Sequence, residues 1–262
     1  MTRETEDATE RDRRRYQREL FDGVARLYAA TRPGYPPELA RFIAATAGAG
    51  PGAAVLEVGC GTGQLTERLV PLGFALTAID VGASMIEVAR ERITAGDVTF
   101  RAAAFEELDA ADASFNLVVS GAAFHWIDPE VRFTRAARLL RPGGWLAVLG
   151  SSERYDEPFG SVLDQMWLDR ANNVGAWVTR PGDADAFAAS GLFGPPVTHS
   201  CAARTAYSAD AVIGVENTRA TSLSWDEEVR DRFNAELREN LNGQGEVQLT
   251  LESGVTMARV RG

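Results

Sequence analysis

The sequence of 262 residues predicts an α/β fold in which a largely parallel sheet carries helices on both faces. From Val55 onward, short apolar runs typical of buried strands alternate with stretches whose apolar residues recur every three or four positions, as in helices. A glycine-rich turn directly follows the first apolar run. Consecutive strand and helix units of this kind place successive strands parallel, and the length suits one large domain with a modest elaboration.

Five strands are predicted in this core, at residues 54–58, 75–80, 98–102, 115–120 and 145–149. Helices are predicted between them, at 64–70, 83–93 and 129–140. The last of these helices is expected to end where Arg141-Pro142-Gly143-Gly144 turns the chain into the fifth strand, because proline and glycine stop a helix.

The flanking segments complete the predicted fold. Two helices at 21–28 and 37–47 are joined by Arg32-Pro33-Gly34-Tyr35-Pro36, a loop stiffened by proline. After the sheet the periodicity weakens over 151–210, and a charged amphipathic helix is predicted at 225–241. Residues 247–251 and 255–260 alternate like strands and are expected to add an antiparallel edge to the sheet.

Composition excludes several kinds of chemistry. The net charge of −10 opposes binding to nucleic acid or to an anionic membrane, so neither is expected as a partner. Apart from His125 and His199 every basic residue is arginine, which excludes a pyridoxal Schiff base and a Walker-type lysine. Cys60 and Cys201 are too few for a disulfide framework and lack the paired spacing of a zinc site, so no metal is expected.

The location of the protein is expected to be cytoplasmic. No apolar run approaches the roughly 20 residues that span a bilayer. The stretch 1–19 is dense in charge and lacks the apolar centre of a secretory signal, so it is predicted to be a solvated tail or a fraying helix.

The strongest local signal is the strand 54–58 followed by Gly59, Gly61 and Gly63. Glycines at such a turn let the backbone approach a ligand closely, at the carboxyl ends of the strands where open α/β sheets bind ligands. The dinucleotide fingerprint would place its third glycine at position 64, where Gln64 stands instead. The pattern therefore favours a nucleotide-like cofactor without a pyrophosphate.

Asp80 ends the second predicted strand, about twenty residues after the glycine turn. A carboxylate at that position can accept hydrogen bonds from both ribose hydroxyls of a bound nucleoside. Asp80 could equally cap the helix that starts near Ala83, and the two roles are compatible.

Four motifs in this order resemble the class I S-adenosylmethionine-dependent methyltransferases. They are Glu57-Val58-Gly59-Cys60-Gly61-Thr62-Gly63, Asp80, Phe115-Asn116-Leu117-Val118-Val119 and Leu140-Arg141-Pro142-Gly143-Gly144. The lead-in Ala25-Arg26-Leu27-Tyr28, the loop from Arg32 to Pro36 and Phe124-His125-Trp126 are similar to the small-molecule branch that contains trans-aconitate and ubiquinone-pathway methyltransferases. The resemblance implies a Rossmann-like class I methyltransferase sheet with an antiparallel edge strand, a C-terminal cap insertion, and S-adenosyl-L-methionine as cofactor.

The resemblance also implies roles for single residues. Glu57 and the backbone of Gly59, Gly61 and Gly63 would surround the methionine portion and the ribose, and Asp80 would hold the ribose hydroxyls. Met85 would pack on the adenine ring, although a helical methionine suits a core equally well. Many relatives have an aspartate after the third strand, where this chain reads Ala103-Ala104-Phe105-Glu106, so the backbone of Ala104 and Phe105 is expected to meet the adenine edge. The expected cofactor-binding residues also include Tyr28, Arg32 and Ser120.

Methyl transfer in this family is an in-line displacement, so the protein mainly supplies alignment and a partly dry cavity. His125 is the candidate catalytic residue, as a base that takes a proton from a hydroxyl or amine, or else it fixes the loop beside Trp126. A carboxylate acceptor needs no base, because it is already ionised near neutrality. Arg32 could position such an acceptor, bind the cofactor carboxylate, or lie in solvent.

The expected function is methyl transfer to a small-molecule acceptor, with O-methylation of a carboxylate or hydroxyl favoured. A non-catalytic S-adenosylmethionine-binding module and a nicotinamide-dependent dehydrogenase are the alternatives. We expect residues 1–50 to form N-terminal helices and a lid, 51–150 the cofactor-binding core, 151–243 a substrate cap and 244–262 terminal edge strands. Tyr155, Trp167, Trp177 and Phe187 are expected either to line the acceptor pocket or to pack the cap onto the sheet.

Overall fold

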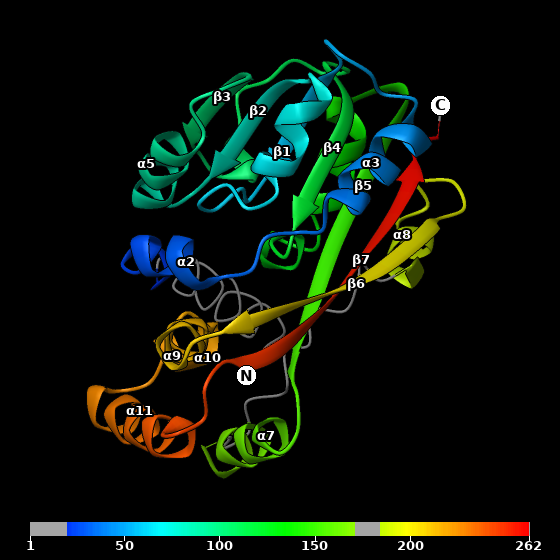
Figure 1. Cartoon of the computed structure of the whole chain (residues 1–262). Coiled ribbons are helices and arrows are strands. Elements are labelled where there is room, and N and C mark those ends of the chain that lie inside the picture. The colour runs from blue at the N-terminus through cyan, green and yellow to red at the C-terminus, as the bar shows by residue number, and fades with distance from the viewer. Residues whose placement is uncertain (1–19, 171–183, 262) are drawn as a thin grey trace, which may run out of the picture.

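A seven-stranded mixed sheet forms the centre of the molecule. The computed structural model describes residues 20–170 and 184–261, and Figure 1 shows their arrangement. The strand order is β3-β2-β1-β4-β5-β7-β6, in which the first five strands are parallel and β7 runs antiparallel to both β5 and β6. The strands are β1 (Ala54–Val58), β2 (Ala75–Asp80), β3 (Asp97–Ala102), β4 (Phe115–Gly121), β5 (Leu140–Tyr155), β6 (Val197–Tyr207) and β7 (Val247–Arg259).

Helices cover both faces of the sheet, as the sequence predicts. Successive side chains of a strand point to opposite faces, so Val55 and Leu56 of β1 belong to two separate apolar clusters. One face packs against α3 (Pro37–Ala47), α4 (Thr66–Leu69) and α5 (Ala83–Arg92). The other packs against α6 (Arg132–Leu139), α8 (Ala184–Ser190) and the 3₁₀ turns η2 (Phe105–Glu107) and η3 (Phe124–Trp126). A further 3₁₀ turn, η1 (Val70–Leu72), follows α4.

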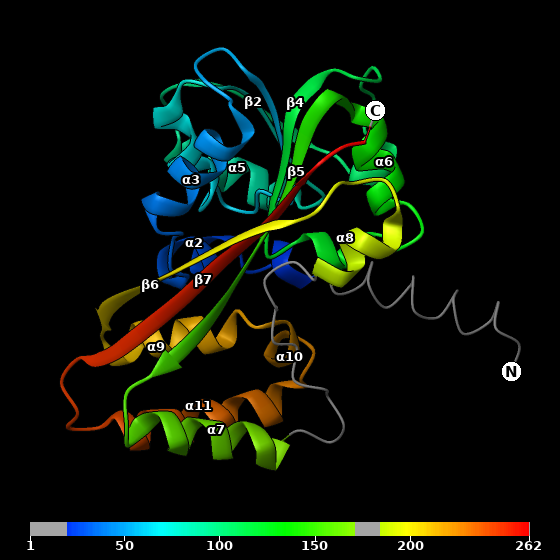
Figure 2. The same ribbon diagram turned by 90° about the vertical axis from the view of Figure 1, so that its right-hand side faces the viewer.

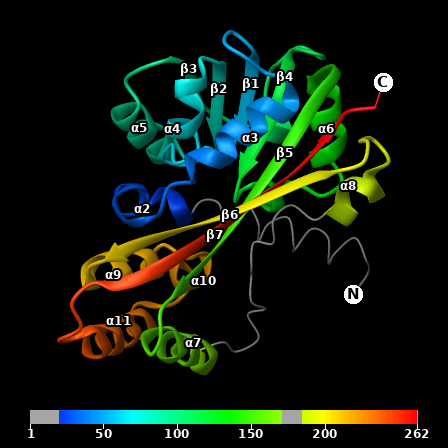
Figure 3. The ribbon, with the colours of Figure 1, turned by 45° about the vertical axis from the view of Figure 1, so that its right-hand side comes forward.

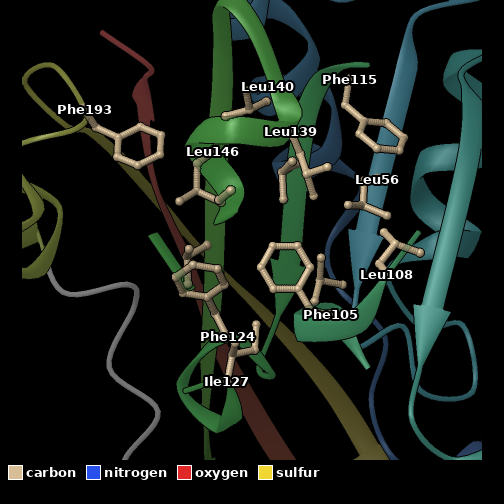
Figure 4. Close-up of a cluster of buried hydrophobic side chains, with 14 of the residues drawn as sticks. Leu56, Phe105, Leu108, Phe115, Phe124, Ile127, Leu139, Leu140, Leu146 and Phe193 are labelled. Carbon is tan, nitrogen blue, oxygen red and sulfur yellow. The ribbon is translucent and has the colours of Figure 1, made fainter. Parts of the chain in front are cut away.

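The cluster on the second face is rich in aromatic side chains, and Figure 4 shows Phe105, Phe115, Phe124 and Phe193 among its leucines. Phe124 and Phe187 each meet the ring of Phe133 edge to face, with centroids 5.3 and 5.4 Å apart. Phe193 closes the cluster from the segment that leads into β6, 5.7 Å from Phe187. These rings hold α8 and η3 against the sheet, and η3 begins just past the end of β4, where the site described below lies.

Three long strands carry a second layer beyond the parallel core. β5, β7 and β6 extend past the carboxyl ends of β1 and β4 toward a group of helices, α7 (Phe159–Arg170), α9 (Ala209–Asn217), α10 (Ala220–Leu223) and α11 (Glu227–Leu241) (Figures 2 and 3). Apolar side chains of α7, α9 and α11 pack on the extended ends of β5 and β7. α2 (Ala25–Thr31) lies between this layer and the core, in contact with α9 and α5.

Most predicted elements agree with the structure. The bounds of β1, β2 and α3 are confirmed, and β3 and β4 are each one residue longer than expected. The helices predicted at 64–70, 83–93, 129–140 and 225–241 are α4, α5, α6 and α11, of which α5 and α11 are slightly shorter than expected, whereas α4 has only 4 residues and α6 only 8. The helix predicted at 21–28 is interrupted by a turn at 23–24, because residues 20–22 are helical and α2 spans Ala25–Thr31. The expectation for 1–19 and the role of Trp177 lie outside the described residues.

The antiparallel part of the sheet corrects three expectations. β5 spans Leu140–Tyr155 instead of 145–149, because Leu140 pairs with Phe115 of β4 at one end and β7 pairs with β5 as far as Tyr155 at the other. The predicted turn at Arg141-Pro142-Gly143-Gly144 therefore lies within β5. The two terminal strands are one strand, β7, since Gly254 in its middle pairs with Gly150 on one side and Ser200 on the other. β7 therefore lies inside the sheet, and the edge is β6, in a stretch whose largely exposed side chains give no strand-like apolar run.

Candidate functional site

Two adjoining cavities lie at the carboxyl ends of β1, β2 and β4. The larger measures about 250 Å³ and the smaller about 120 Å³. Both are bordered by Tyr28, Gly59, Gly61, Gly121 and Ala122. A ligand with two chemically different halves can therefore lie across the ends of β1 and β4, with one half in each cavity.

The glycine turn brings backbone to the junction of the cavities. Gly59 and Gly61 have φ values of 70° and 53°, which side chains of L-residues rarely adopt. A Cβ at Gly59 would lie 2.2 Å from the Cβ of Ala123, whereas a Cβ at Gly61 would meet no atom within 4 Å. Gly63 lines neither cavity, and a Cβ there would lie 2.5 Å from Ile93, so its role is close packing of the turn against the end of α5.

Asp80 ties the glycine turn to the end of β2. Its Oδ2 accepts a hydrogen bond from the amide of Gly61 and its Oδ1 one from the amide of Gly82, both at 2.9 Å. Burial raises the pKa of Asp80, and these two amides oppose the shift. The N-terminal amides of α5 are not capped by Asp80, because Ser84 and Met85 donate to Asp22 at 2.7 and 3.2 Å. Asp80 lines the smaller cavity.

The smaller cavity has largely apolar walls. Met85 and Phe105 are 3% exposed and line it, together with Ile79, Trp126 and Ile127. Phe21 closes the cavity from the N-terminal side, and its ring meets those of Tyr28 and Trp126 edge to face. Ala103, Phe105 and Glu106 border the cavity, whereas Ala104 does not. This cavity therefore suits a flat apolar ring next to a group that donates hydrogen bonds to Asp80.

Glu57 is a buried acid in the wall of the larger cavity. It is 1% exposed and accepts a hydrogen bond of 2.7 Å from the hydroxyl of Thr66. Burial raises the pKa of Glu57 to about 8, although the bond from Thr66 opposes the shift. A cationic group in the cavity would favour the ionised form, because an opposite charge lowers the pKa of a carboxyl.

Two arginines hold a third acid at the far side of the larger cavity. Glu153, on the extension of β5, accepts hydrogen bonds from Arg32 at 3.1 Å and from Arg219 at 2.8 Å. Burial alone would raise the pKa of Glu153, but Arg219 and Arg32 lower it below its usual value. Arg219 also forms a bidentate pair with Glu216, which is fully buried. The pairs with Glu153 connect three parts of the fold, because Arg32 follows α2, Glu153 lies in β5 and Arg219 lies in the turn between α9 and α10.

His125 and Ser120 do not line either of the two cavities, within the described part of the chain. The His125 ring lies in η3 with its centroid 4.7 Å from that of Trp126, which itself lines the smaller cavity. Ser120 is fully buried, and its hydroxyl donates to the carbonyl of Val58 at 2.8 Å, so it joins β4 to β1. The next residues along the chain, Gly121 and Ala122, border both cavities.

The structure places eight of the predicted site residues in the walls of the cavities. They are Tyr28, Arg32, Glu57, Gly59, Gly61, Asp80, Met85 and Phe105. The sequence prediction missed Tyr35, Glu153 and Arg219. Tyr35 lies in the proline-punctuated loop that the sequence singles out, and its hydroxyl is close to Gly121. Glu153 lies just past the predicted end of the fifth strand. No local motif marks Arg219, whose place depends on contacts with residues more than 60 positions earlier.

The large aromatic residues of 151–225 do not line the cavities within the described part of the chain. Tyr155 and Trp167 pack in the apolar cluster between α7, α9 and α11, and Phe187 packs under the sheet. Four residues of the same stretch, Ser151, Ser152, Glu153 and Arg219, line the larger cavity instead.

The described residues contain neither a cluster of metal-binding side chains nor a helix that could span a membrane. Residues 20–170 and 184–261 contain no group of three or more His, Cys, Asp and Glu side chains that could hold a metal ion. In the same ranges, every helix is too short or too polar to cross a membrane.

Comparisons with known proteins agree with this geometry. Residues 56–148 match a family model described as a methyltransferase domain. An uncharacterized methyltransferase of Mycobacterium tuberculosis is 35% identical over 146 residues, which cover 55% of this chain and 56% of that protein. A malonyl-[acyl-carrier protein] O-methyltransferase of Hahella chejuensis is 34% identical over 148 residues, which cover 53% of this chain and 50% of that protein. The chain thus matches about half the length of these relatives.

The fold has solved counterparts. A proposed type II methyltransferase from Anaeromyxobacter dehalogenans superposes with a TM-score of 0.64 at 22% identity, over 87% of this chain and 97% of that one. This likeness confirms the predicted Rossmann-like class I methyltransferase fold, with its mostly parallel sheet and antiparallel edge.

Proposed function

Because residues 56–148 carry a methyltransferase domain, we propose that this chain transfers the methyl group of S-adenosylmethionine to a small-molecule acceptor. The observation that supports it most is the junction of two cavities at Gly59 and Gly61, with Glu57 in the wall of the larger cavity and Asp80 in the wall of the smaller one. Such a site suits a cofactor whose nucleoside half is apolar and flat and whose amino-acid half is charged.

The residues present fit the adenosyl half of this cofactor. Asp80 lines the smaller cavity, where its carboxylate can accept hydrogen bonds from the ribose hydroxyls. Met85 and Phe105 supply apolar walls for the adenine ring. Gly61 leaves open space at the junction that any side chain would fill.

The larger cavity fits the methionine half and the acceptor. Glu57 can bind the cofactor ammonium, which would also stabilise the ionised form of this buried acid. The cofactor supplies an activated methyl group on a sulfonium. The chain aligns the acceptor with that methyl group and excludes water, for which the walls formed by Tyr28, Tyr35 and Leu65 are suited.

We favour a carboxylate as the acceptor, because Glu57, the one carboxylic acid in the lining of the larger cavity whose pKa is raised, is assigned to the cofactor ammonium, and the other titratable residues described in that lining are weak bases. Burial raises the pKa of Tyr28, Tyr35 and Cys60, so none of them ionises easily. Glu153 is held by Arg219 and Arg32, which make it a weak base. A carboxylate acceptor is already ionised near neutrality and needs no base. Several similar proteins are named O-methyltransferases of malonyl-[acyl-carrier protein], which agrees with this choice.

A hydroxyl acceptor with His125 as the base is the second candidate. The ring of His125 contacts Trp126, a wall of the smaller cavity, and Ala122, three residues before His125, borders both cavities. This candidate predicts a large loss of turnover on replacement of His125, whereas a carboxylate acceptor does not.

We further propose that the layer of 151–243 is a substrate cap and that 1–50 contributes a lid. Glu153 and Arg219 of the cap and Arg32 of the N-terminal segment line the same side of the larger cavity. The terminal strand β7 supports the cap by pairing with the extension of β5.

Calorimetry with S-adenosylmethionine and its demethylated product, S-adenosylhomocysteine, tests the proposal, followed by methyl-transfer assays on carboxylic acids, phenols and amines. We expect binding of both nucleosides and turnover of an acid. Binding without turnover of any acceptor would favour a non-catalytic binding module. Binding of reduced nicotinamide cofactor in place of both nucleosides would favour a dehydrogenase.

A further inference from the structure

The two arginines of the larger cavity differ in how their nitrogens are used. All three guanidinium nitrogens of Arg32 donate hydrogen bonds. Nε donates to the hydroxyl of Thr218 and Nη2 to its carbonyl, both at 2.9 Å, and Nη1 donates to Glu153. Arg219 uses Nε and Nη2, which donate to Glu216 and Glu153. No hydrogen-bond partner of Nη1 of Arg219 is found among the described residues.

The guanidinium of Arg219 is held in a fixed orientation. Its bonds to Glu216 measure 2.7 and 2.9 Å and form a bidentate pair, and Glu216 is itself held by the indole of Trp167 at 2.8 Å. Glu153 fixes the same guanidinium from a second side at 2.8 Å. A donor held in this way loses little conformational entropy when a ligand binds, which favours affinity and selectivity.

Arg219 also faces the cavity. Its side chain is 31% exposed, whereas the side chains of its partners Glu153 and Glu216 are 9% and 0% exposed. Arg219 lines the larger cavity beside Tyr28 and Arg32. The two arginines and the two glutamates have no net charge together, and Arg219 is the one arginine of the two whose Nη1 has no hydrogen-bond partner among the described residues.

We propose that Arg219 is a specificity-determining residue that binds a carboxylate of the acceptor through Nη1, with Glu153 and Glu216 as its positioning residues. Hydrogen bonds between a guanidinium and a carboxylate are about twice as strong as those between neutral groups, so this donor selects an acid over the matching amide. The inference deepens the proposed function and rests on it. The competing assignment is that Arg219 binds the carboxylate of the cofactor.

The test is calorimetry on the full chain saturated with S-adenosylhomocysteine, titrated with dicarboxylic acids of three to six carbons and with the corresponding diamides. We expect at least one acid to bind the unmodified chain, and its diamide to bind about tenfold more weakly or not at all. The Glu216→Gln/Arg219→Gln double variant should bind that acid about 10- to 100-fold more weakly and bind S-adenosylhomocysteine within about twofold of the unmodified chain. This double variant keeps a neutral hydrogen-bonded pair, so no buried charge is left alone.

Two further variants sharpen the test. Arg219→Lys keeps the charge but cannot hold two acids and a ligand in one plane, so it should also weaken acid binding. Arg154→Gln is the matched control, because Arg154 lies next to Glu153 on β5 but is 73% exposed and pairs with Glu252 on the surface. It should bind the acid as the unmodified chain does.

The outcomes separate this inference from the proposed function. Failure of the unmodified chain to bind S-adenosylhomocysteine would overturn both. If the nucleoside binds, the inference alone is overturned by equal affinity for acid and diamide, by binding of none of the acids, or by unchanged acid binding in the double variant. A loss of S-adenosylhomocysteine affinity in the double variant as large as the loss for the acid would assign Arg219 to the cofactor carboxylate instead.

Discussion

The carboxylate of Asp80 accepts a hydrogen bond from the backbone amide of Gly61, with 2.9 Å between Oδ2 and the nitrogen. This bond fixes the end of β2 to the turn after β1, so the acid and the glycine that border the smaller cavity keep a constant separation. Changes at either residue should therefore affect ligand binding through this shared geometry.

Replacement of Asp80 by alanine should weaken the binding of S-adenosylhomocysteine by about 1–3 kcal/mol, because charge-assisted bonds to the ribose would be lost. Calorimetry at constant pH measures the change. Asp109→Ala is the control, since Asp109 is exposed and lines neither of the described cavities. Equal affinities of the two variants would contradict the ribose role of Asp80.

Replacement of Gly61 by valine should abolish nucleoside binding, because the added side chain would enter the junction of the two cavities. The positive φ of 53° adds strain to any such variant. Gly48→Val is a matched control, because Gly48 has a φ of 60°, also has no atom within 4 Å of its Cβ position, and ends α3 away from the cavities. Both variants should lose similar stability in urea, and only Gly61→Val should lose binding. Retained binding in Gly61→Val would place the nucleoside elsewhere.

The stability of the ligand-free chain should fall as pH rises through the range set by Glu57. Burial raises the pKa of this carboxyl to about 8, against a value near 4.3 in an unfolded chain, so the folded state binds the proton more tightly. The contribution of Glu57 is fully present below the unfolded pKa and is lost as pH approaches 8, with a slope of up to about 1.4 kcal/mol per pH unit. Urea unfolding between pH 5 and 8 measures it. In the Glu57→Gln variant, which cannot ionise at this position, the free energy of unfolding should fall less steeply with pH. Parallel pH profiles of the free energy of unfolding in the two proteins would refute the raised pKa of Glu57.

Ligand binding should release a proton from the same residue. An ammonium beside Glu57 favours the carboxylate, so at pH 6–7 the calorimetric enthalpy of S-adenosylhomocysteine binding should depend on the ionisation enthalpy of the buffer. The dependence should be smaller in Glu57→Gln. If both proteins show the same dependence, another group supplies the proton.

Replacement of Glu153 by glutamine should destabilise the chain by about 3 kcal/mol, because Arg32 and Arg219 would lose the carboxylate that they share, which is 9% exposed. The exposed pair of Arg154 and Glu252 lies on the same sheet, and Glu252→Gln should change stability by less than about 1 kcal/mol. Urea unfolding at pH 7 compares them. A change in Glu153→Gln no larger than that in Glu252→Gln would show that the buried pairs add no net stability.

Replacement of His125 by asparagine should reduce turnover less than about tenfold once the acceptor is known, because a carboxylate acceptor needs no base. Cofactor affinity, measured in parallel by calorimetry, should be nearly unchanged. A fall of about 10²–10⁴-fold in turnover at unchanged cofactor affinity would instead support a hydroxyl or amine acceptor with His125 as its base.

The parts of the fold and site that follow local rules could be predicted from the sequence. The glycine turn, the end of β2 at Asp80 and the position of Met85 on α5 depend on neighbouring residues and on the periods of strands and helices. The first four strands of the parallel core share this property, so the bounds of β1 to β4 agree closely with the structure.

The parts that depend on distant pairing could not be predicted. β6 has largely exposed side chains, and its strand structure comes from pairing with β7, some 50 residues later. The length of β5 has the same origin, which is why Glu153 lay beyond the predicted strand. Arg219 becomes part of the site only because the α9–α10 turn packs against the extended end of β5, where it pairs with Glu153. No sequence motif indicates this contact.

The unbroken ladder between β5 and β7 has a mechanical consequence. Paired residues run from Trp145 and Arg259, within the core, to Tyr155 and Leu249, beneath the helices of the second layer. A hinge motion between the two layers would have to break backbone hydrogen bonds between β5 and β7, since both strands run through both layers. We therefore expect the parallel core and the second layer to move as one rigid unit. The wall formed by Tyr28, Arg32 and Tyr35 is joined to neither layer by a strand, and Arg32 attaches it to Thr218 and Glu153 through hydrogen bonds of its side chain.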